Sequence, residues 1–327
     1  MARKSKNNKN ILNIYYYTFL ITMDSRCFVE KYDYFAQNNI NISTHIMTNI
    51  SDFESFFYIY FSYKCDIVQN NGKFISLYYP NYDFIHFDTF FLLCDNKRKI
   101  YHLFDSFLYF SNLLKKMQCC DLYFINFNVN NILFLESNQH CMMQKFEKCV
   151  KKSDFMQFIP IYMKNINSHD ILPIDLLILH LFYNTNISTI NTTNIKIVVN
   201  IIEKNNTFLK TIYGEDKFKM LIIKYIRMNY LNKTKSDIID YIYQNIDSFP
   251  IYSLTLIYAE LFWSYVNVHH SDNVFFLKTM SFFRRNLHPD INKRFSIENS
   301  IHFLQNHFNY TKNIFYIKDF INLMTSS

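Results

Sequence analysis

The chain contains only two glycines, Gly72 and Gly214, among its 327 residues. Glycine-rich phosphate-binding loops need several glycines close together, because the backbone must approach the phosphate without a side chain in the way. A G-x-G-x-x-G fingerprint and a P-loop are therefore excluded, and any nucleotide would have to bind without a glycine-rich loop. Collagen, β-propellers and sandwiches with glycine turns are equally disfavoured.

Hydrophobic residues make up 50% of the sequence and charged residues 19%. A chain of this length and composition can bury a large core, and intrinsic disorder, which needs low hydrophobicity and high charge, is excluded. Ile, Asn, Lys, Tyr and Phe are frequent at the expense of Ala, Gly, Arg and Pro, which indicates codons from an AT-rich genome. The composition predicts a soluble, globular and largely helical protein.

The seven cysteines have no regular spacing. Four of them lie near one another in the sequence and near His140, but the paired C-x2-4-C spacing of zinc sites is absent; they are Cys119, Cys120, Cys141 and Cys149. We therefore expect free thiols, no metal site and a reducing, cytoplasmic location.

The N-terminal residues 1–10 are basic and are predicted to form a disordered tail. The apolar stretch 11–23 is shorter than the roughly 20 residues that cross a bilayer, and it is interpreted as a β-strand. No small-residue cleavage site precedes Asp24, which disfavours a signal peptide. We predict no membrane-spanning segment.

Residues 11–80 have a strand-like pattern. The aromatic run 56–61 favours β-structure, and the apolar runs 64–68 and 73–79 flank Asn70-Asn71-Gly72. An Asn-Gly pair between two apolar runs predicts a β-hairpin. We expect this part of the chain to be small and β-rich.

After Pro80 the apolar residues recur at three- and four-residue spacing, which predicts helices. We predict them at residues 87–91, 100–117, 174–183, 194–203, 217–228, 236–246, 252–266, 273–285 and 297–308. The predicted fold class is therefore α+β, with a β-rich part at 11–80 and a larger helical part at 81–327.

The segment 121–134, D-L-Y-F-I-N-F-N-V-N-N-I-L-F, follows a long amphipathic helix. It resembles the catalytic loop of protein kinases, H-R-D-L-x-x-x-N followed by an apolar strand. In this alignment Asn126 stands at the catalytic Asp and Asn131 at the metal-binding Asn. The family's D-F-G follows about ten to fifteen residues later. That distance is occupied by Lys145 at the Asp, Phe146 at the Phe and Glu147 at the Gly.

A second match lies at residues 286–296, which resemble the L-x-x-D-P-x-x-R-x-(S/T) segment near the end of the kinase C-lobe. Asp290, Arg294 and Ser296 are in register, whereas Ile291 stands where the Pro should be. The resemblance implies that Arg294 is structural, because the family's Arg pairs with a buried Glu at the end of the activation segment. No A-P-E sequence is found to receive it. Ser296 is also predicted to cap a helix.

Two segments resemble the start of the kinase F helix, whose buried Asp braces the catalytic loop. Asp175 lies at about the right distance, and residues 251–254 resemble the W-S-L of that helix, although Pro250 stands where an Asp should precede it. Both candidates stay open. The stretch between Asp175 and Arg294 is longer than usual, which suggests an inserted helical block.

Over roughly residues 75–310 the chain is similar to the divergent kinase-like proteins of large cytoplasmic DNA viruses. The resemblance implies a protein-kinase-like fold with a reduced β-rich N-lobe and a larger helical C-lobe that carries the inserted block. For a viral protein of this kind, the location would be the infected-cell cytoplasm.

Phosphoryl transfer needs one carboxylate to orient the substrate hydroxyl, another carboxylate with an Asn for magnesium, and a strand lysine for the phosphates. Here Asn126 and Lys145 replace the two carboxylates, and Asn131 alone is a poor magnesium ligand. Lys64 and Lys73 are candidates for the strand lysine by position only. The resemblance therefore implies an inactive pseudokinase, a binding or regulatory scaffold with a protein partner and no cofactor.

Two alternatives stay open. An atypical active kinase would use ATP and magnesium, with Glu147 as the metal carboxylate or Asp121 as the base. A basic helical protein unrelated to kinases would bind nucleic acid or a viral assembly. The net charge of +7 is compatible with the second alternative, but no contiguous basic stripe stands out in the sequence.

Overall fold

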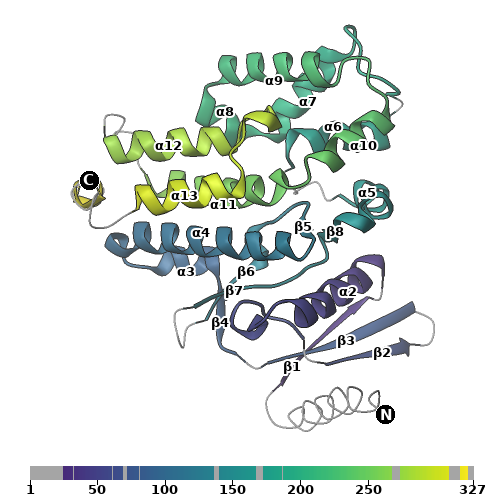
Figure 1. Ribbon diagram of the computed structural model, residues 1–327, viewed down its shortest axis with the longest axis vertical. Helices are drawn as coiled ribbons and strands as arrows, with labels where there is room; N and C mark the ends of the chain where they lie inside the picture. Colours follow the sequence, from purple (N-terminus) through teal and green to yellow (C-terminus); the bar gives the residue numbers. More distant parts are fainter. Residues whose placement is uncertain are drawn as a thin grey trace, which may run out of the picture. The chain divides into compact units, whose positions relative to one another are not determined.

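The computed structural model describes residues 25–31, 33–60, 62–68, 72–80, 82–135, 140–166, 172–185, 187–266, 273–308 and 317–322. The predicted basic tail and the predicted strand at 11–23 lie outside the described residues. The fold is α+β, with helices and small antiparallel sheets (Figure 1).

The chain forms two compact units, each built from two segments. The first unit comprises residues 1–90 and 130–148, and the second comprises residues 91–129 and 149–327. The sequence predicted a tail at 1–10 and one boundary between folded parts, after residue 80. In the structure the segment 130–148 belongs to the first unit. Its strand at 132–135 pairs with the strand at 84–86, which is part of the first unit, and with the strand at 140–143.

The first sheet of the first unit has the order β1–β3–β2 and is antiparallel throughout. Its strands are β1 (Ser25–Lys31), β2 (Ser62–Val68) and β3 (Gly72–Pro80). The register of β2 and β3 places Val68 opposite Gly72, so the two strands predicted to form a hairpin do pair with each other. Ile75 and Leu77 of β3 are buried.

Helix α2 (Tyr34–Asn49) corrects the prediction that the whole of residues 11–80 is strand-like. Its buried face includes Ala36, Ile40 and Ile46, at helical spacing. Asp33 caps its N-terminus, because the Asp33 carboxylate accepts hydrogen bonds from the backbone N–H groups of Phe35 and Ala36 at 2.9 and 3.0 Å.

The aromatic run 56–61 is not a regular strand over its described residues. Residues 57–60 are buried, but only Phe57 forms a β-bridge, with Met143. High β-propensity here reflects burial of large side chains rather than participation in a sheet.

A second sheet of the first unit has the order β4–β6–β7. It consists of β4 (Phe84–His86), β6 (Ile132–Leu135) and β7 (His140–Met143). Every residue of β6 is buried, as expected for the apolar strand that follows the 121–131 segment. Helix α3 (Phe87–Leu93) follows β4 directly.

The core of the second unit is built around helix α4 (Asn96–Cys119), which packs against α11 (Ser248–Tyr265) and α13 (Ile297–His307). The apolar residues of α4 that predicted a helix are buried, namely Leu103, Phe107, Phe110, Leu113 and Leu114. A two-stranded sheet pairs β5 (Leu122–Phe124) with β8 (Cys149–Lys151), and α12 (Val274–Asn286) packs on α11.

The remaining helices of the second unit form a block between β8 and α11. In this block α6 packs against α5, α7 and α10, and α9 packs against α7 and α8 (Figure 1). Their bounds are α5 (Phe155–Lys164), α6 (Ile174–Asn184), α7 (Ile195–Asn205), α8 (Thr207–Tyr213), α9 (Glu215–Asn229) and α10 (Lys235–Gln244).

The helices predicted after residue 80 are confirmed, with small shifts of their ends. The sequence analysis missed α5 and α8. Helix α5 contains Pro160, which interrupts a helical pattern, and α8 has only 7 residues, too few for a clear period. Among the described residues, no helix combines the length and the apolar character that a bilayer span requires.

Candidate functional site

In the first unit, the two segments that the kinase resemblance places at the metal-binding Asn and at D-F-G are joined by hydrogen bonds. The side-chain amide of Asn131 donates to the carbonyl of Gln144 at 3.0 Å and to the carbonyl of Lys145 at 2.6 Å. The backbone N–H of Gln144 returns a hydrogen bond to the carbonyl of Asn131 at 2.9 Å. Asn131 is only 2% exposed, and its bond to the Gln144 carbonyl is buried, whereas its bond to the Lys145 carbonyl is partly buried.

Helix α2 contacts the same segment through two neighbouring asparagines. The side-chain oxygen of Asn39 accepts a hydrogen bond from the backbone N–H of Phe146 at 3.0 Å, and the Asn38 amide donates to the carbonyl of Glu147 at 3.1 Å. The ring of Phe146 is buried and packs edge-on against Phe57, with 5.8 Å between the ring centroids. The segment 144–147 is therefore held both by Asn131 and by α2.

The chemistry of this junction is that of a structural clamp. The amide nitrogen of Asn131 donates to two backbone carbonyls, so the side chain is directed toward the backbone of residues 144–145. Lys145 is exposed, and its backbone has a left-handed φ of 59°. A lysine ammonium at this position repels a divalent cation, and Glu147, half-buried, is the carboxylate of the segment.

Asn126, which the resemblance placed at the catalytic Asp, belongs to the second unit and follows β5. The residue is 3% exposed, and its amide makes no hydrogen bond with any described residue. An amide cannot take up a proton at neutral pH, so Asn126 cannot serve as a general base.

The second unit also contains a buried ion pair between Asp175 and Arg294, two of the three residues, with Phe146, that the resemblance marked as structural. Arg294 Nη2 lies 3.2 Å from Asp175 Oδ2, and the side chains of Arg294 and Asp175 are 1% and 0% exposed. Arg294 also donates from Nε to the carbonyl of His288 at 2.8 Å and from Nη2 to the carbonyl of Pro289 at 3.2 Å. This pairing was not predicted from the sequence.

Tyrosine side chains contact both members of this ion pair. The hydroxyls of Tyr225 and Tyr230 both donate to Asp175 Oδ1. The ring of Tyr252 faces the Arg294 guanidinium at 4.4 Å, a cation–π contact. Burial, together with the charge of Asp175, raises the pKa of Tyr230 well above its usual value, so its hydroxyl remains a donor.

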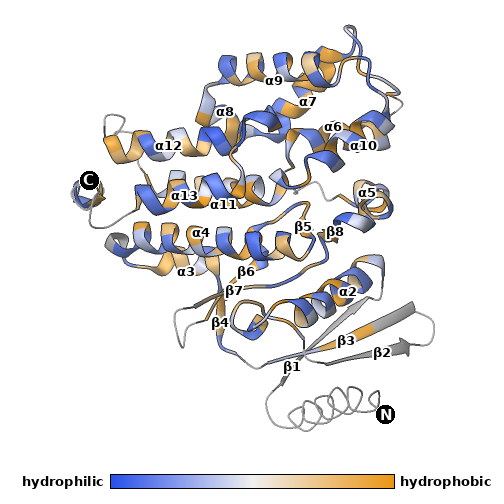
Figure 2. Ribbon diagram, viewed as in Figure 1, coloured by the Kyte–Doolittle hydropathy of each residue, from blue (hydrophilic) through white to orange (hydrophobic). Residues whose placement is uncertain are grey.

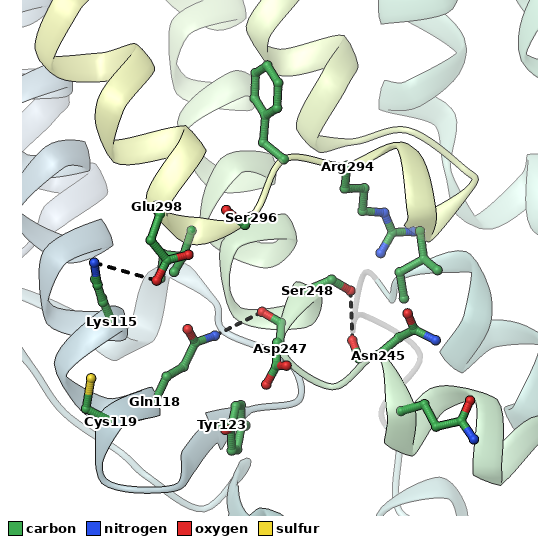
Figure 3. Close-up of a pocket in the computed structure, with 14 residues that line it drawn as sticks. Lys115, Gln118, Cys119, Tyr123, Asn245, Asp247, Ser248, Arg294, Ser296 and Glu298 are labelled. Carbon is green, nitrogen blue, oxygen red and sulfur yellow. Dashed lines mark hydrogen bonds and ion pairs between the residues drawn. The ribbon is translucent and has the colours of Figure 1, made fainter.

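A cavity of about 500 Å³ lies within the second unit (Figure 3). It is lined by the end of α4, by β5, by the turn between α10 and α11, and by the segment that leads into α13. The lining residues are Lys115, Gln118, Cys119, Tyr123, Gln244, Asn245, Asp247, Ser248, Ile291, Arg294, Phe295, Ser296, Ile297 and Glu298.

The polar groups of the cavity interact mainly with one another. Lys115 Nζ lies 3.6 Å from a Glu298 carboxylate oxygen, and the Gln118 amide donates to the carbonyl of Asp247 at 2.9 Å (Figure 3). Burial and the nearby Asp247 carboxylate raise the pKa of Tyr123 to about 12. Several polar groups of the lining are thus paired with one another, and its tyrosine is protonated at neutral pH.

The described residues contain no group of three or more His, Cys, Asp or Glu side chains that could hold a metal ion. The cysteines that have side-chain descriptions are free, as predicted. Burial raises the pKa of Cys141 to about 12 and the pKa of Cys149 still further, so both remain thiols rather than thiolate ligands.

Sequence reasoning missed Asn39, Tyr225 and Tyr230. Asn39 is a polar residue on the buried face of α2 (5% exposed), which would have been a usable signal had α2 itself been predicted. The two tyrosines lie on the buried side of α9 and just after its end, where an aromatic residue is most simply core.

Comparison with known proteins does not add an identification: no family model matches the sequence, and no curated protein matches it. The function is therefore argued from the geometry of the two units.

Proposed function

We propose that this chain is a protein-kinase-like protein that has lost phosphotransfer chemistry and acts as a binding or regulatory scaffold. The observation that carries the proposal is the junction between Asn131 and residues 144–147 in the first unit. In active kinases the catalytic-loop Asn and the D-F-G Asp both hold magnesium and so lie close together. The two segments that the resemblance places at these motifs are hydrogen-bonded to each other here.

Helix α2 supports the same proposal. In kinases an N-lobe helix carries the Glu that pairs with the strand lysine, and the position of this helix relative to D-F-G controls activity. Helix α2 follows a strand of the first sheet, and its Asn39 contacts Phe146 of the D-F-G-like segment. The contact is made by a neutral amide and a backbone N–H, so it fixes the segment without contributing charge.

The loss of catalysis follows from the side chains at the aligned positions. General base catalysis contributes about 10²–10⁴ to a rate, and Asn126 cannot provide it. Lys145 stands where a magnesium carboxylate is needed, and the Asn131 amide is bonded to the backbone. The active alternative would require Glu147 or Asp121 to take over the missing carboxylate roles.

We further propose that the scaffold works through a protein partner in the cytoplasm, which would be that of an infected cell if the protein is viral. A scaffold of this kind requires exposed helical surface, and helices α4–α13 of the second unit have exposed residues.

A titration with ATP, with and without magnesium, tests the proposal by thermal unfolding of the full chain. A ligand present at about 100 times its dissociation constant adds about 2.7 kcal/mol of apparent stability. We expect no shift in either condition. A magnesium-dependent shift would show that a carboxylate has taken over metal binding, and the active-kinase alternative would replace the pseudokinase proposal.

A further inference from the structure

Helix α9 presents a stripe of exposed cations and methionines, which we name the α9 stripe. Its members are spaced at i, i+3, i+7, i+10 and i+11, so they share one face of the helix. Met220 and Met228 are 64% and 66% exposed, among the most exposed large apolar side chains of the described residues. The stripe consists of Lys217, Met220, Lys224, Arg227 and Met228.

The opposite face of α9 is anchored in the second unit. Phe218, Ile222 and Ile226 are buried, and the hydroxyl of Tyr225 donates to the buried Asp175 carboxylate. The helix also packs against α7 and α8. The stripe is therefore held on a fixed helix, and the apolar core does not need its two methionines.

The three cations of the stripe have no ion-pair partner among the described residues. Lys219 of the same helix differs, because its Nζ lies 3.6 Å from a carboxylate oxygen of Glu203 on α7. Figure 2 shows hydrophobic and hydrophilic residues alternating along α9. The stripe thus combines unpaired positive charge with exposed, flexible apolar side chains.

Exposed apolar side chains rimmed by polar residues mark interaction surfaces, and methionine adapts its shape to varied partners. Unpaired cations beside the methionines select negative charge by complementarity. We propose that the α9 stripe binds an acidic, amphipathic helical segment of a protein partner. Carboxylates of that segment pair with Lys217, Lys224 and Arg227, and its apolar side chains pack on the two methionines. The inference rests on the proposed scaffold function and names its partner's chemistry.

The residue composition of the stripe favours a protein partner over a membrane or a nucleic acid. A helix that binds a bilayer inserts a wide apolar face, often with aromatic residues, whereas the wide apolar face of α9 is buried in the fold. Nucleic-acid binding is dominated by contacts to phosphates, and methionine side chains offer neither a positive charge nor a hydrogen-bond donor to a phosphate.

The experiment is a selection of helical peptides from a random library on the immobilised full chain. Peptides about as long as α9 itself, which has 15 residues, suit the purpose. We expect the selected peptides to carry Asp or Glu beside apolar residues at helical spacing. A labelled selected peptide then serves as the probe for fluorescence anisotropy.

Two variants of the stripe are compared with a matched control. Lys217→Glu combined with Lys224→Glu and Arg227→Glu should weaken peptide binding at least about tenfold, because each attractive pair becomes repulsive. Met220→Asn combined with Met228→Asn should also weaken it. The control is Leu277→Asn combined with Lys278→Glu, an exposed apolar residue and an exposed cation on α12, which should leave binding unchanged.

Three results would overturn the proposal. The selected peptides could lack acidic residues, the stripe variants could bind the probe as the unaltered chain does, or the chain could bind phosphatidylserine vesicles or a DNA duplex through the stripe.

The ATP titration reports separately on the scaffold function. Nucleotide binding with intact peptide recognition contradicts the pseudokinase alone, and failed peptide recognition without a nucleotide response contradicts the stripe alone.

Discussion

The Arg294 guanidinium lies 3.2 Å from the Asp175 carboxylate, and both side chains are buried away from the solvent. The contact joins the first turn of α6 to the segment before α13, across 119 residues of sequence. Two tyrosine hydroxyls donate to the same carboxylate, so the buried negative charge has several partners. The pair ties the block of helices α5–α10 to the body of the second unit.

Asp175→Asn should lower the free energy of unfolding by about 3–5 kcal/mol, because Arg294 would remain buried without its counter-charge. Urea denaturation followed by circular dichroism measures the change. Lys115→Met is the matched control, since it breaks the exposed Lys115–Glu298 pair and should cost less than about 1 kcal/mol. Equal effects of the two substitutions would contradict this account of the buried pair.

Asn131→Ala should destabilise the protein by about 1–3 kcal/mol, because the backbone carbonyls of Gln144 and Lys145, in a buried and a partly buried hydrogen bond, lose their donor. Guanidinium denaturation measures the loss, with Asn200→Ala on the exposed surface of α7 as the control. The structural account also requires that Asn131→Ala leaves the response to ATP and magnesium unchanged. A variant of normal stability with altered magnesium binding would assign Asn131 to a metal site instead.

Asn126→Asp combined with Lys145→Asp restores both carboxylates of the kinase pattern and should still give no measurable phosphotransfer. The sequence still lacks a glycine-rich loop to hold the phosphates. In addition, the carboxylate introduced in place of the Asn126 amide would occupy a site that is 3% exposed, with no hydrogen-bond partner among the described residues. Transfer from radiolabelled ATP to a protein substrate is the assay. Magnesium-dependent transfer above that of the unaltered chain would reverse the conclusion.

His307 should make the protein less stable as the pH falls from about 6.5 toward 4. Burial, with Lys278 nearby, lowers the pKa of His307 to about 4, whereas an unfolded histidine titrates near 6.5. In that window the unfolded chain binds a proton that the folded chain excludes, so stability falls by up to about 1.4 kcal/mol per pH unit. Its ring nitrogen Nε2 lies 3.0 Å from Thr279 Oγ1 inside the core.

Unfolding free energies measured from pH 4 to pH 7 test this dependence. His307→Gln should flatten the slope, whereas His302→Gln, an exposed histidine on the same helix, should leave it unchanged. Identical slopes for all three proteins would mean that the pH response comes from other groups. His288 is one such group, because burial lowers its pKa to about 4 as well.

Local patterns predicted most elements of this fold, since they act over only a few residues. The spacing of Leu103, Phe107 and Phe110 was enough to predict α4, because a buried face repeats every three or four residues. The Asn-Gly pair between apolar runs predicted that β2 pairs with β3. Helix α2 was missed, because asparagines and threonines dilute its apolar face.

The candidate site was only partly predictable. The kinase resemblance singled out Asn131 and, at the expected distance from it, Lys145, and the structure joins the two residues through the Asn131 amide. The partner of Asn131 is a backbone carbonyl, which has no sequence signature. The α9 stripe was also missed, because its cations are scattered along the sequence and align only when the helix forms.

The sequence by itself determined the α+β class, the order of most helices and the absence of a glycine-rich phosphate loop, because periodicity and residue type depend on near neighbours. Only the tertiary structure decided that residues 130–148 return to the first unit and that Asp175 and Arg294 meet. Those contacts depend on long-range burial, in which a charge removed from water must find a partner wherever the chain brings one close.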